Sequence, residues 1–225
     1  MAAGEGTRLR PVTERWPKPV LPIDGRPVLA TLLRELRAAG CERAWVVTGH
    51  LAEQVEGLIG DGSAFGLEVR TTRQPGVLGS ADAVKRALDA GATPPCLVVA
   101  ADTVFRPGDV GRVRDAFAES GAAGAIAVRR DPPPGPGRRV VDVEDGRVVR
   151  IREGEGPLSG APLWGLGSEL TRYLCVDREP YELDNSYRAA LAAGETIVAP
   201  EIGKTRDLTD PLDLVEENFP YLSGT

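Results

Sequence analysis

Two glycines separated by one residue stand near the start of the chain, and basic side chains follow them closely. Gly4 and Gly6 let the backbone approach a ligand, because glycine has no side chain to block it. Successive N–H groups of such a loop can point at an anion. Arg8, Arg10 and Lys18 add positive charge in the same stretch. This combination suits a polyphosphate ligand, although a G-x-G alone is also typical of a simple turn.

A carboxylate stands directly after a short apolar run, in Val98-Val99-Ala100-Ala101-Asp102. In open α/β sheets, ligands bind beyond the carboxyl ends of the strands. An aspartate at that place can hold a metal ion that bridges phosphates. It can equally cap a helix or a turn. Position alone leaves both interpretations of this aspartate open.

The elements that must position these residues alternate between helices and strands. Apolar residues at helical spacing predict helices over residues 28–39, 51–59, 81–90 and 110–120. Short apolar runs predict buried strands over 44–48, 96–100 and 123–128, and a strand nearer an edge over 67–72. Strands separated by helices need crossover connections. The sequence therefore predicts an α/β fold with a Rossmann-like, mostly parallel sheet flanked by helices.

The pattern changes after Arg130. Proline and glycine dominate residues 131–137, which predicts an exposed loop. Asp145-Gly146 lies between two apolar runs and predicts a β-hairpin. Beyond it we expect a strand over 161–166, a helix over 187–193, an extended segment over 196–199 and a helix over 211–218. We expect a single domain, 1–225, made of the halves 1–130 and 131–225.

Composition bounds the class of protein. Of the 225 residues, 42% are hydrophobic and 27% are charged, and the net charge is −6. These values are typical of a soluble globular protein and argue against nonspecific nucleic-acid binding, which needs a basic face. The chain shows neither a membrane-spanning run nor a signal segment. Cys41, Cys96 and Cys175 lack the spacing of a metal site or a disulfide framework. We therefore expect a cytoplasmic protein that binds neither membranes nor nucleic acid.

The first stretch resembles a family signature. A-A-G-E-G-T-R-L-R-P, followed by P-K-P-V-L-P, is similar to the signature of the sugar-phosphate nucleotidyltransferases, of the glucose-1-phosphate thymidylyltransferase and UTP–sugar-1-phosphate uridylyltransferase type. These enzymes join a nucleoside triphosphate to a sugar 1-phosphate. The resemblance implies that Arg8 neutralises the departing pyrophosphate and that Lys18 bridges phosphates of both substrates. It also implies a triphosphate cradle formed by Ala3, Gly4, Gly6 and Thr7.

A second segment, Q-P-G-V-L-G-S-A-D-A-V, resembles the block with which relatives hold a uracil or thymine ring. The resemblance implies that Gln74, Gly79 and Ser80 bind the nucleotide. A glutamine amide offers both a donor and an acceptor to a base edge. Without the resemblance, this segment predicts a turn with an N-cap at Ser80.

A third segment, D-L-T-D-P-L-D-L, is similar to the family's D-x-x-T-P-x-D-L, whose first aspartate is a metal ligand. The resemblance therefore implies Mg²⁺ held by Asp102 and Asp207. Asp210 stands where threonine is usual, and we expect it to cap the last helix ahead of a proline. We expect Asp213 to be a solvated acid of the first turn. His50, in a run that also resembles relatives, is expected to be structural because no catalytic partner set is evident.

The sequence departs from the family pattern in three places. Relatives carry an apolar strand before A-A-G, and here Met1 stands in the place of its last residue. An upstream start would supply that strand, whereas a true start at Met1 would leave the fold without its central strand. Arg138-Arg139 replaces a tyrosine–glycine pair whose glycine touches the sugar. Glu153-Gly154-Glu155 replaces E-K-P, so the lysine that meets the sugar phosphate is missing. Arg150 or Arg152 could replace that lysine, and Glu153 is expected to accept a hydrogen bond from a sugar hydroxyl.

Three functions are compatible with these residues. The leading one is a magnesium-dependent nucleotidyltransferase that makes a nucleotide sugar and pyrophosphate from UTP or dTTP and a sugar 1-phosphate. The departures on the sugar side favour two alternatives. One is the same chemistry on a non-hexose phosphate acceptor, and the other is a catalytically idle regulatory subunit that binds a nucleotide sugar. Residues 1–130 would bind the nucleotide, and 131–225 would bind the sugar and supply the second metal ligand. A homo-oligomer is left open.

Overall fold

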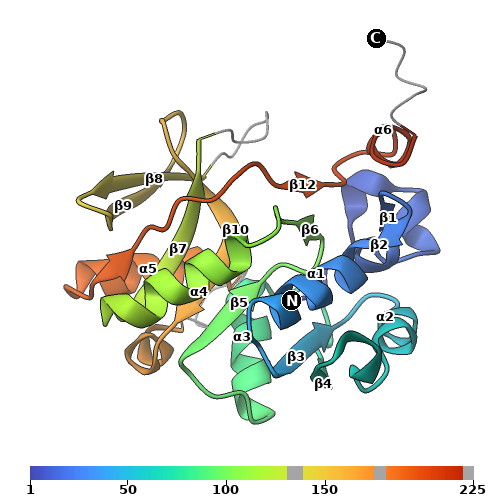
Figure 1. Ribbon diagram of the computed structural model, residues 1–225, viewed down its shortest axis with the longest axis horizontal. Coiled ribbons are helices and arrows are strands. Elements are labelled where there is room, and N and C mark those ends of the chain that lie inside the picture. Colours follow the sequence, from blue (N-terminus) through green and yellow to red (C-terminus); the bar gives the residue numbers. More distant parts are fainter. Residues whose placement is uncertain (131–138, 175–180, 220–225) are drawn as a thin grey trace. The chain divides into compact units, whose positions relative to one another are not determined.

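The protein is described from a computed structural model (Figure 1). The structure describes residues 1–130, 139–174 and 181–219, so the loop expected over 131–137 lies outside the described residues. The chain divides into two compact units, each built from segments that are far apart in sequence. The first unit contains Met1–Val77, Ala100–Val104 and Arg206–Thr225, and the second contains Leu78–Val99 and Phe105–Thr205.

The first unit contains a parallel strand pair. β3 and β4 pair in parallel along their whole length, and α2 connects them and packs against both (Figure 1). The N–H of Ala2 donates to the Val47 carbonyl at 2.8 Å, and the Met1 carbonyl accepts from the Ala101 N–H at 2.9 Å. The segment before the glycine loop therefore lies between β3 and the segment that carries Asp102. The elements of this unit are η1 (Thr7–Leu9), η2 (Val12–Glu14), η3 (Lys18–Val20), β1 (Pro22–Ile23), β2 (Arg26–Pro27), α1 (Val28–Ala38), β3 (Arg43–Thr48), α2 (Ala52–Ile59), η4 (Ser63–Phe65), β4 (Glu68–Arg73), β6 (Thr103–Val104), β12 (Arg206–Asp207) and α6 (Asp213–Glu216).

A small apolar cluster in the first unit joins the segments that carry candidate site residues. It contains one residue just after the glycine loop, one three residues after Lys18 and one directly after Asp207. Burying these side chains removes apolar surface from water, which stabilises the meeting of the three segments. The buried members of the cluster are Leu9, Leu21, Ile23, Val28 and Leu208.

A six-stranded sheet forms the second unit, in the order β5-β10-β7-β11-β9-β8. β10 runs antiparallel to both β5 and β7, so these two strands share a direction without being neighbours. α4 packs on β7, β10 and β11, and α5 packs on β9 (Figure 1). The elements of this unit are α3 (Ser80–Asp89), β5 (Cys96–Val99), α4 (Asp109–Ser120), β7 (Gly124–Arg129), β8 (Arg139–Glu144), β9 (Arg147–Glu153), β10 (Ser159–Leu166), η5 (Ser168–Tyr173), α5 (Leu183–Ala192) and β11 (Ile197–Val198).

The α/β class predicted from the sequence is confirmed, and the predicted helices and strands up to residue 199 are present with shifted ends. The expectation of a mostly parallel sheet is wrong for the second unit, where β11 with β7 is the parallel pair among the described strands. The other pairings are antiparallel, because β10 runs against β5 and β7 and the β8–β9 hairpin adds antiparallel neighbours. The hairpin is also confirmed, because β8 and β9 pair around Asp145 and Gly146. These two turn residues have φ values of 48° and 74°, the left-handed conformation that a two-residue type I′ turn requires. Among the described residues, we find no helix with the length and apolar character that a bilayer crossing needs.

The end of the first unit differs from the prediction. The last helix is shorter than expected, and Asp213 is half-buried rather than a solvated acid. Its carboxylate accepts hydrogen bonds from the N–H groups of Thr209 and Asp210. Asp210 in turn accepts from the Leu212 N–H at 2.7 Å. These bonds close a turn over residues that were expected to begin the helix, and so α6 begins only at Asp213.

One glycine of the first unit allows a close backbone approach to the glycine loop. A Cβ added at Gly49 would lie 2.8 Å from the carbonyl oxygen of Ala3 and 2.9 Å from its Cβ. We predict that Gly49→Ala lowers the free energy of unfolding by about 1–3 kcal/mol, the usual effect of overpacking. Urea denaturation followed by circular dichroism measures this change.

The matched control is Gly57→Ala in α2 of the same unit. A Cβ added there meets nothing within 4 Å. Because alanine favours a helix over glycine, the control should stabilise the protein by about 1 kcal/mol. Equal stabilities of the two variants would contradict the packing described for Gly49.

Candidate functional site

The glycine loop is supported from one side and open at Gly4. Gly6 has φ +63°, in the left-handed region that favours glycine. A Cβ at Gly6 would lie 2.9 Å from Thr13 Cγ2 and 3.6 Å from Lys18 Cβ, so the loop passes directly beside both residues. The Thr13 hydroxyl donates to the Gly6 carbonyl at 2.9 Å. At Gly4 an added Cβ would meet nothing within 4 Å, which leaves room for a ligand.

Two side chains hold the segment that follows the glycine loop. His50 Nε2 lies 2.6 Å from the Thr13 carbonyl and donates to it, since a carbonyl oxygen can only accept. Gln54 donates to the Arg15 carbonyl at 2.7 Å. His50 thus makes a structural contact, in line with the sequence-based expectation. Sequence reasoning missed Thr13 and Gln54, because neither belongs to a motif with a spacing of its own.

The buried ammonium of Lys18 pairs with two carboxylates. Its Nζ lies 2.9 Å from Asp102 Oδ2 and 3.8 Å from Asp207 Oδ2. The Lys18 side chain is only 10% exposed, whereas the two aspartates are 35% and 37% exposed. An ammonium buried to this degree is costly unless it is paired. The pairing of Asp207 with Thr103 between β12 and β6 brings the two aspartates to the same place.

The donor set at this place fits a magnesium ion. Mg²⁺ prefers carboxylate oxygens and is usually held by one or two of them, with substrate phosphates and water completing its shell. Asp102 and Asp207 carry two negative charges against the single positive charge of Lys18, so the three side chains keep a net negative charge. Within the described ranges, there is no group of three or more His, Cys, Asp or Glu side chains arranged around a cation. A cation held here would take its other ligands from substrate and solvent.

The remaining candidate residues of the first unit lie close along the chain to these elements. Arg8 lies in η1 and is exposed. Arg10 pairs with Glu5 at 3.1 Å across the glycine loop. Gln74 follows β4 and is 6% exposed. Its backbone N–H donates to the Thr48 carbonyl at 2.8 Å. The residues predicted to bind phosphates and metal, and one of those predicted to bind the base, therefore share one unit, and they are Ala3, Gly4, Gly6, Thr7, Arg8, Lys18, Gln74, Asp102 and Asp207.

Gly79 and Ser80 belong to the second unit. Gly79 has φ +103°, and a Cβ there would lie 2.5 Å from the Tyr181 carbonyl oxygen, so a close backbone approach requires glycine. The N-cap of α3 is Gly79, and so Ser80 does not cap its own helix as the local sequence suggested. The Ser80 hydroxyl instead donates to Glu182 at 2.7 Å and accepts from the Leu183 N–H at 2.7 Å. Because Leu183 is the first residue of α5, Ser80 caps a helix that is remote in sequence.

Glu153, the predicted sugar ligand, ends β9 and is exposed. It lies opposite Arg139, which forms an ion pair with the buried Asp184. The guanidinium of Arg139 lies 5.9 Å from the centre of the Trp164 ring. Burial lowers the pKa of Arg139 below its usual value, although neighbouring carboxylates oppose this effect. Sequence reasoning had no signal for Asp184, whose partner stands far away in the chain.

Arg152 is less available as a substitute for the missing lysine. Its Nε and Nη2 donate to the Asp142 carboxylate at 2.9 and 3.1 Å. Its Nη1 donates to the Glu155 carbonyl at 3.0 Å. Arg150 is exposed in β9. Arg139, in contrast, is held by the buried Asp184 and lies near the ring of Trp164.

These parts define a class of protein. An open glycine loop, a buried lysine beside it and two partly exposed aspartates form a site suited to phosphate groups on an α/β scaffold. A family model described as nucleotidyl transferase matches residues 1–154. The chain belongs to the nucleotidyl transferase family.

Similar proteins have related names. The low-salt glycan biosynthesis nucleotidyltransferase Agl11 of Haloferax volcanii is 32% identical over 155 residues, which are 68% of this chain and 43% of that protein. The N-acetylmuramate alpha-1-phosphate uridylyltransferase of Neisseria meningitidis serogroup B is 36% identical over 105 residues, 46% of each chain. Each match spans less than half of the curated relative. The solved UDP-glucose pyrophosphorylase from Acinetobacter baumannii superposes with a TM-score of 0.76 at 21% identity, covers 96% of this chain and 89% of that one, and shares the fold.

The cap that Ser80 provides leads to a stability prediction. Ser80→Ala removes the acceptor for the Leu183 N–H at the start of α5. We expect it to lower the free energy of unfolding by about 1 kcal/mol, as loss of a helix cap usually does. The control is Ser168→Ala, at an exposed serine of the same unit. Chemical denaturation measures both, and equal stabilities would show that Ser80 caps nothing.

Proposed function

We propose that this protein is a magnesium-dependent sugar-1-phosphate nucleotidyltransferase. It would make a nucleotide sugar and pyrophosphate from a nucleoside triphosphate, with UTP or dTTP favoured, and a sugar 1-phosphate. The observation that carries this proposal is the buried Lys18 ammonium, paired with Asp102 and Asp207 beside the open glycine loop. Family membership and the names of the relatives support it.

The reaction needs positioning and neutralisation of charge. An oxygen of the sugar 1-phosphate attacks the α-phosphorus in line, and the bond from that phosphorus to the oxygen bridging to the β-phosphorus breaks. Pyrophosphate leaves with the bond electrons, so the chain supplies no covalent nucleophile. Holding two phosphate esters in line converts a bimolecular step into an intramolecular one. Fixed cations and N–H groups stabilise the charge that develops on the oxygens.

Each candidate residue has a role in this proposal. The backbone of Ala3, Gly4, Gly6 and Thr7 binds the triphosphate, and the open space at Gly4 admits it. Arg8 neutralises the departing pyrophosphate, and Lys18 contacts phosphates of both substrates. Gln74, Gly79 and Ser80 bind the base, and Glu153 accepts a hydrogen bond from the sugar. Because the Ser80 hydroxyl has two partners within the protein, this residue would contribute through its backbone.

Asp102 and Asp207 would hold Mg²⁺. When bound, the ion supplies positive charge to phosphate oxygens. Lys18 balances part of the charge of these two carboxylates and so keeps them close to each other. The same ammonium would also contact a phosphate, which can approach it because the two aspartates beside it are partly exposed.

Substitution of the three central residues tests the proposal. We expect kcat to fall about 100-fold or more in each of three variants, Asp102→Asn, Asp207→Asn and Lys18→Met. This is the usual loss of kcat when one electrostatic contact of an active site is removed. The assay is pyrophosphate release with Mg²⁺, crossing four nucleoside triphosphates with a panel of sugar 1-phosphates. The control is Asp89→Asn, at an exposed aspartate of α3 that pairs with Lys85. Turnover of the Asp102 variant near that of the control would refute this mechanism.

One observation favours an acceptor other than a hexose 1-phosphate. Arg139 stands where the resemblance places a glycine that touches the sugar, and its guanidinium pairs with Asp184 close to Trp164. An arginine side chain fills volume that a glycine leaves free. The same chemistry on a smaller or differently shaped phosphate acceptor is therefore the second candidate function. Turnover by the purified protein alone would exclude an idle regulatory subunit.

The acceptor range tests the role of Arg139. We predict that Arg139→Gly combined with Asp184→Asn raises kcat/KM for hexose 1-phosphates relative to the acceptor that the wild type prefers. The second substitution avoids leaving the buried Asp184 carboxylate without its counter-ion, which would destabilise the protein. The control is Asp184→Asn alone, and KM for the triphosphate should not change. An unchanged ranking of acceptors would exclude Arg139 as their selector.

A further inference from the structure

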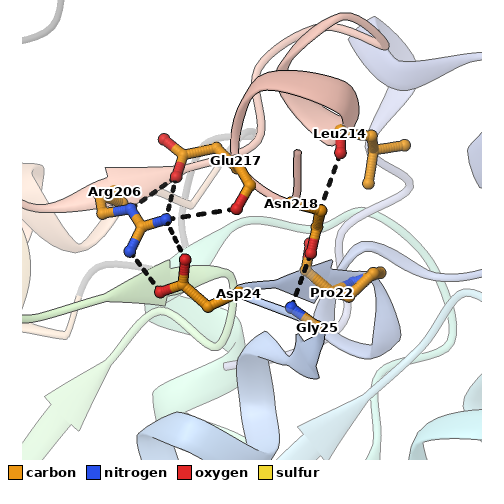
Figure 2. A network of polar contacts seen from close by, with 7 residues as sticks. All are labelled: Pro22, Asp24, Gly25, Arg206, Leu214, Glu217 and Asn218. Carbon is orange, nitrogen blue, oxygen red and sulfur yellow. Dashed lines mark hydrogen bonds and ion pairs between the residues drawn. The ribbon is translucent and has the colours of Figure 1, made fainter. Parts of the chain in front are cut away.

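A polar network surrounds Arg206, the residue directly before Asp207 (Figure 2). Arg206 Nη1 and Nη2 donate to the two carboxylate oxygens of Asp24 at 2.6 and 2.9 Å. Arg206 also donates from Nε to the Glu217 carboxylate at 2.5 Å and from Nη2 to the Glu217 carbonyl at 3.4 Å. We name the side chains of Asp24, Arg206, Glu217 and Asn218 the Arg206 network.

Asn218 extends this network to the backbone of two other segments (Figure 2). Its Oδ1 accepts from the Gly25 N–H at 2.8 Å, and its Nδ2 donates to the Pro22 carbonyl at 2.8 Å. Nδ2 also donates to the Leu214 carbonyl at 2.9 Å. The turn between β1 and β2 is thereby tied to the end of α6, and all of these residues belong to the first unit.

The strand that carries Asp207 is too short to fix its own position. β12 has two residues and pairs with β6, which also has two. Successive side chains of a strand point to opposite faces. Arg206 therefore enters the network on one face, while Asp207 reaches Lys18 from the other. A polar anchor and a candidate ligand are thus adjacent in the chain.

The Arg206 network is more than one exposed ion pair. The side chains of Arg206, Asp24 and Glu217 are 35%, 66% and 26% exposed, and the two carboxylates share one guanidinium. An isolated exposed pair contributes little to stability. A planar guanidinium that binds in fork geometry, however, fixes the direction as well as the distance of its partners. A lysine could keep the charge at this position, but it could not reproduce the fork.

We propose that Arg206 is a positioning residue, which holds the Asp207 carboxylate in its place beside Lys18 and Asp102. The hydrogen bonds of the Arg206 guanidinium go to Asp24 and Glu217, and no step of the proposed reaction uses its charge. The inference rests on the proposed function, because the role of Asp207 as a magnesium ligand comes from it. Groups that orient metal ligands usually control metal affinity and activity without touching the metal.

The test compares two arginines that make similar forks. Arg206→Ala is the test variant, and Arg130→Ala is the control, because Arg130 binds Glu201 through Nε and Nη2 at 2.8 and 2.9 Å in the second unit. We expect Arg206→Ala to raise the Mg²⁺ concentration for half-maximal turnover and to lower kcat, each about 10–100-fold. The KM for the nucleoside triphosphate at saturating Mg²⁺ should change little. Arg130→Ala should match the wild type, and Arg206→Lys should fall between.

Two further measurements do not depend on turnover. Hydrogen exchange should become faster at the backbone amides of 207–213 in Arg206→Ala, but not in Arg130→Ala. Asp24→Asn should reproduce this change, and the double variant of Asp24 and Arg206 should exceed neither single variant by much, because the two residues act as one pair.

The outcomes separate the inference from the proposed function. If Arg206→Ala matches Arg130→Ala in its Mg²⁺ requirement and in exchange, the positioning role is overturned. If the wild type turns over no substrate pair, the proposed function fails, and the exchange experiment decides the rest. Faster exchange at 207–213 would then still support Arg206 as the anchor of this segment, whereas unchanged exchange would overturn it.

Discussion

The ion pairs of the buried Lys18 ammonium are the interaction on which the candidate site depends. A lysine with a side chain that is 10% exposed needs a negative partner close by, and here it has two. The partners come from segments far apart in the sequence, one before β6 and one in β12. Satisfying a single charge therefore requires three distant segments of the first unit to meet. The apolar cluster of Leu9, Leu21 and Leu208, against which Val104 packs, brings the same segments together through apolar side chains.

Around this pairing, several candidate site groups have a second group that holds them in place. Thr13 supports the glycine loop, and His50 in turn holds the Thr13 carbonyl. The Arg206 network has the equivalent relation to Asp207. In the second unit, Ser80 fixes the start of α5, the helix that carries Asp184. These contacts limit where the candidate site residues can be.

Much of the fold and part of the site could be predicted from the sequence. Helices such as α1 and strands such as β7 have a local signal, because the spacing of their apolar residues reflects the surface they bury. Asp145-Gly146 predicted a hairpin for an equally local reason, since both residues tolerate positive φ. Lys18, Asp102 and Asp207 could be singled out because they belong to segments that resemble a family.

The rest depends on partners that local spacing does not encode. Nothing around Asp24 indicates that it pairs with Arg206, which lies far along the chain. Ser80 looks like a cap for α3, and only the folded chain brings the start of α5 to its hydroxyl. The sequence predicts Asp213 to be a surface acid of a helix, yet its carboxylate accepts hydrogen bonds from backbone N–H groups of the turn before that helix. Such side-chain partners are set by tertiary structure, and so sequence reasoning did not find them.

The central claim is that Asp102 and Asp207 hold a divalent cation beside Lys18 at the phosphates of a nucleotide. The most direct measurement is the anomalous scattering of Mn²⁺ in crystals grown with Mn²⁺ and a nucleoside triphosphate. We expect a peak within coordination distance of both carboxylates, in contact with the phosphates and adjacent to the Lys18 ammonium. A bound nucleotide with its cation elsewhere, and with Asp102 and Asp207 contacting only Lys18, would show that these aspartates do not hold the cation.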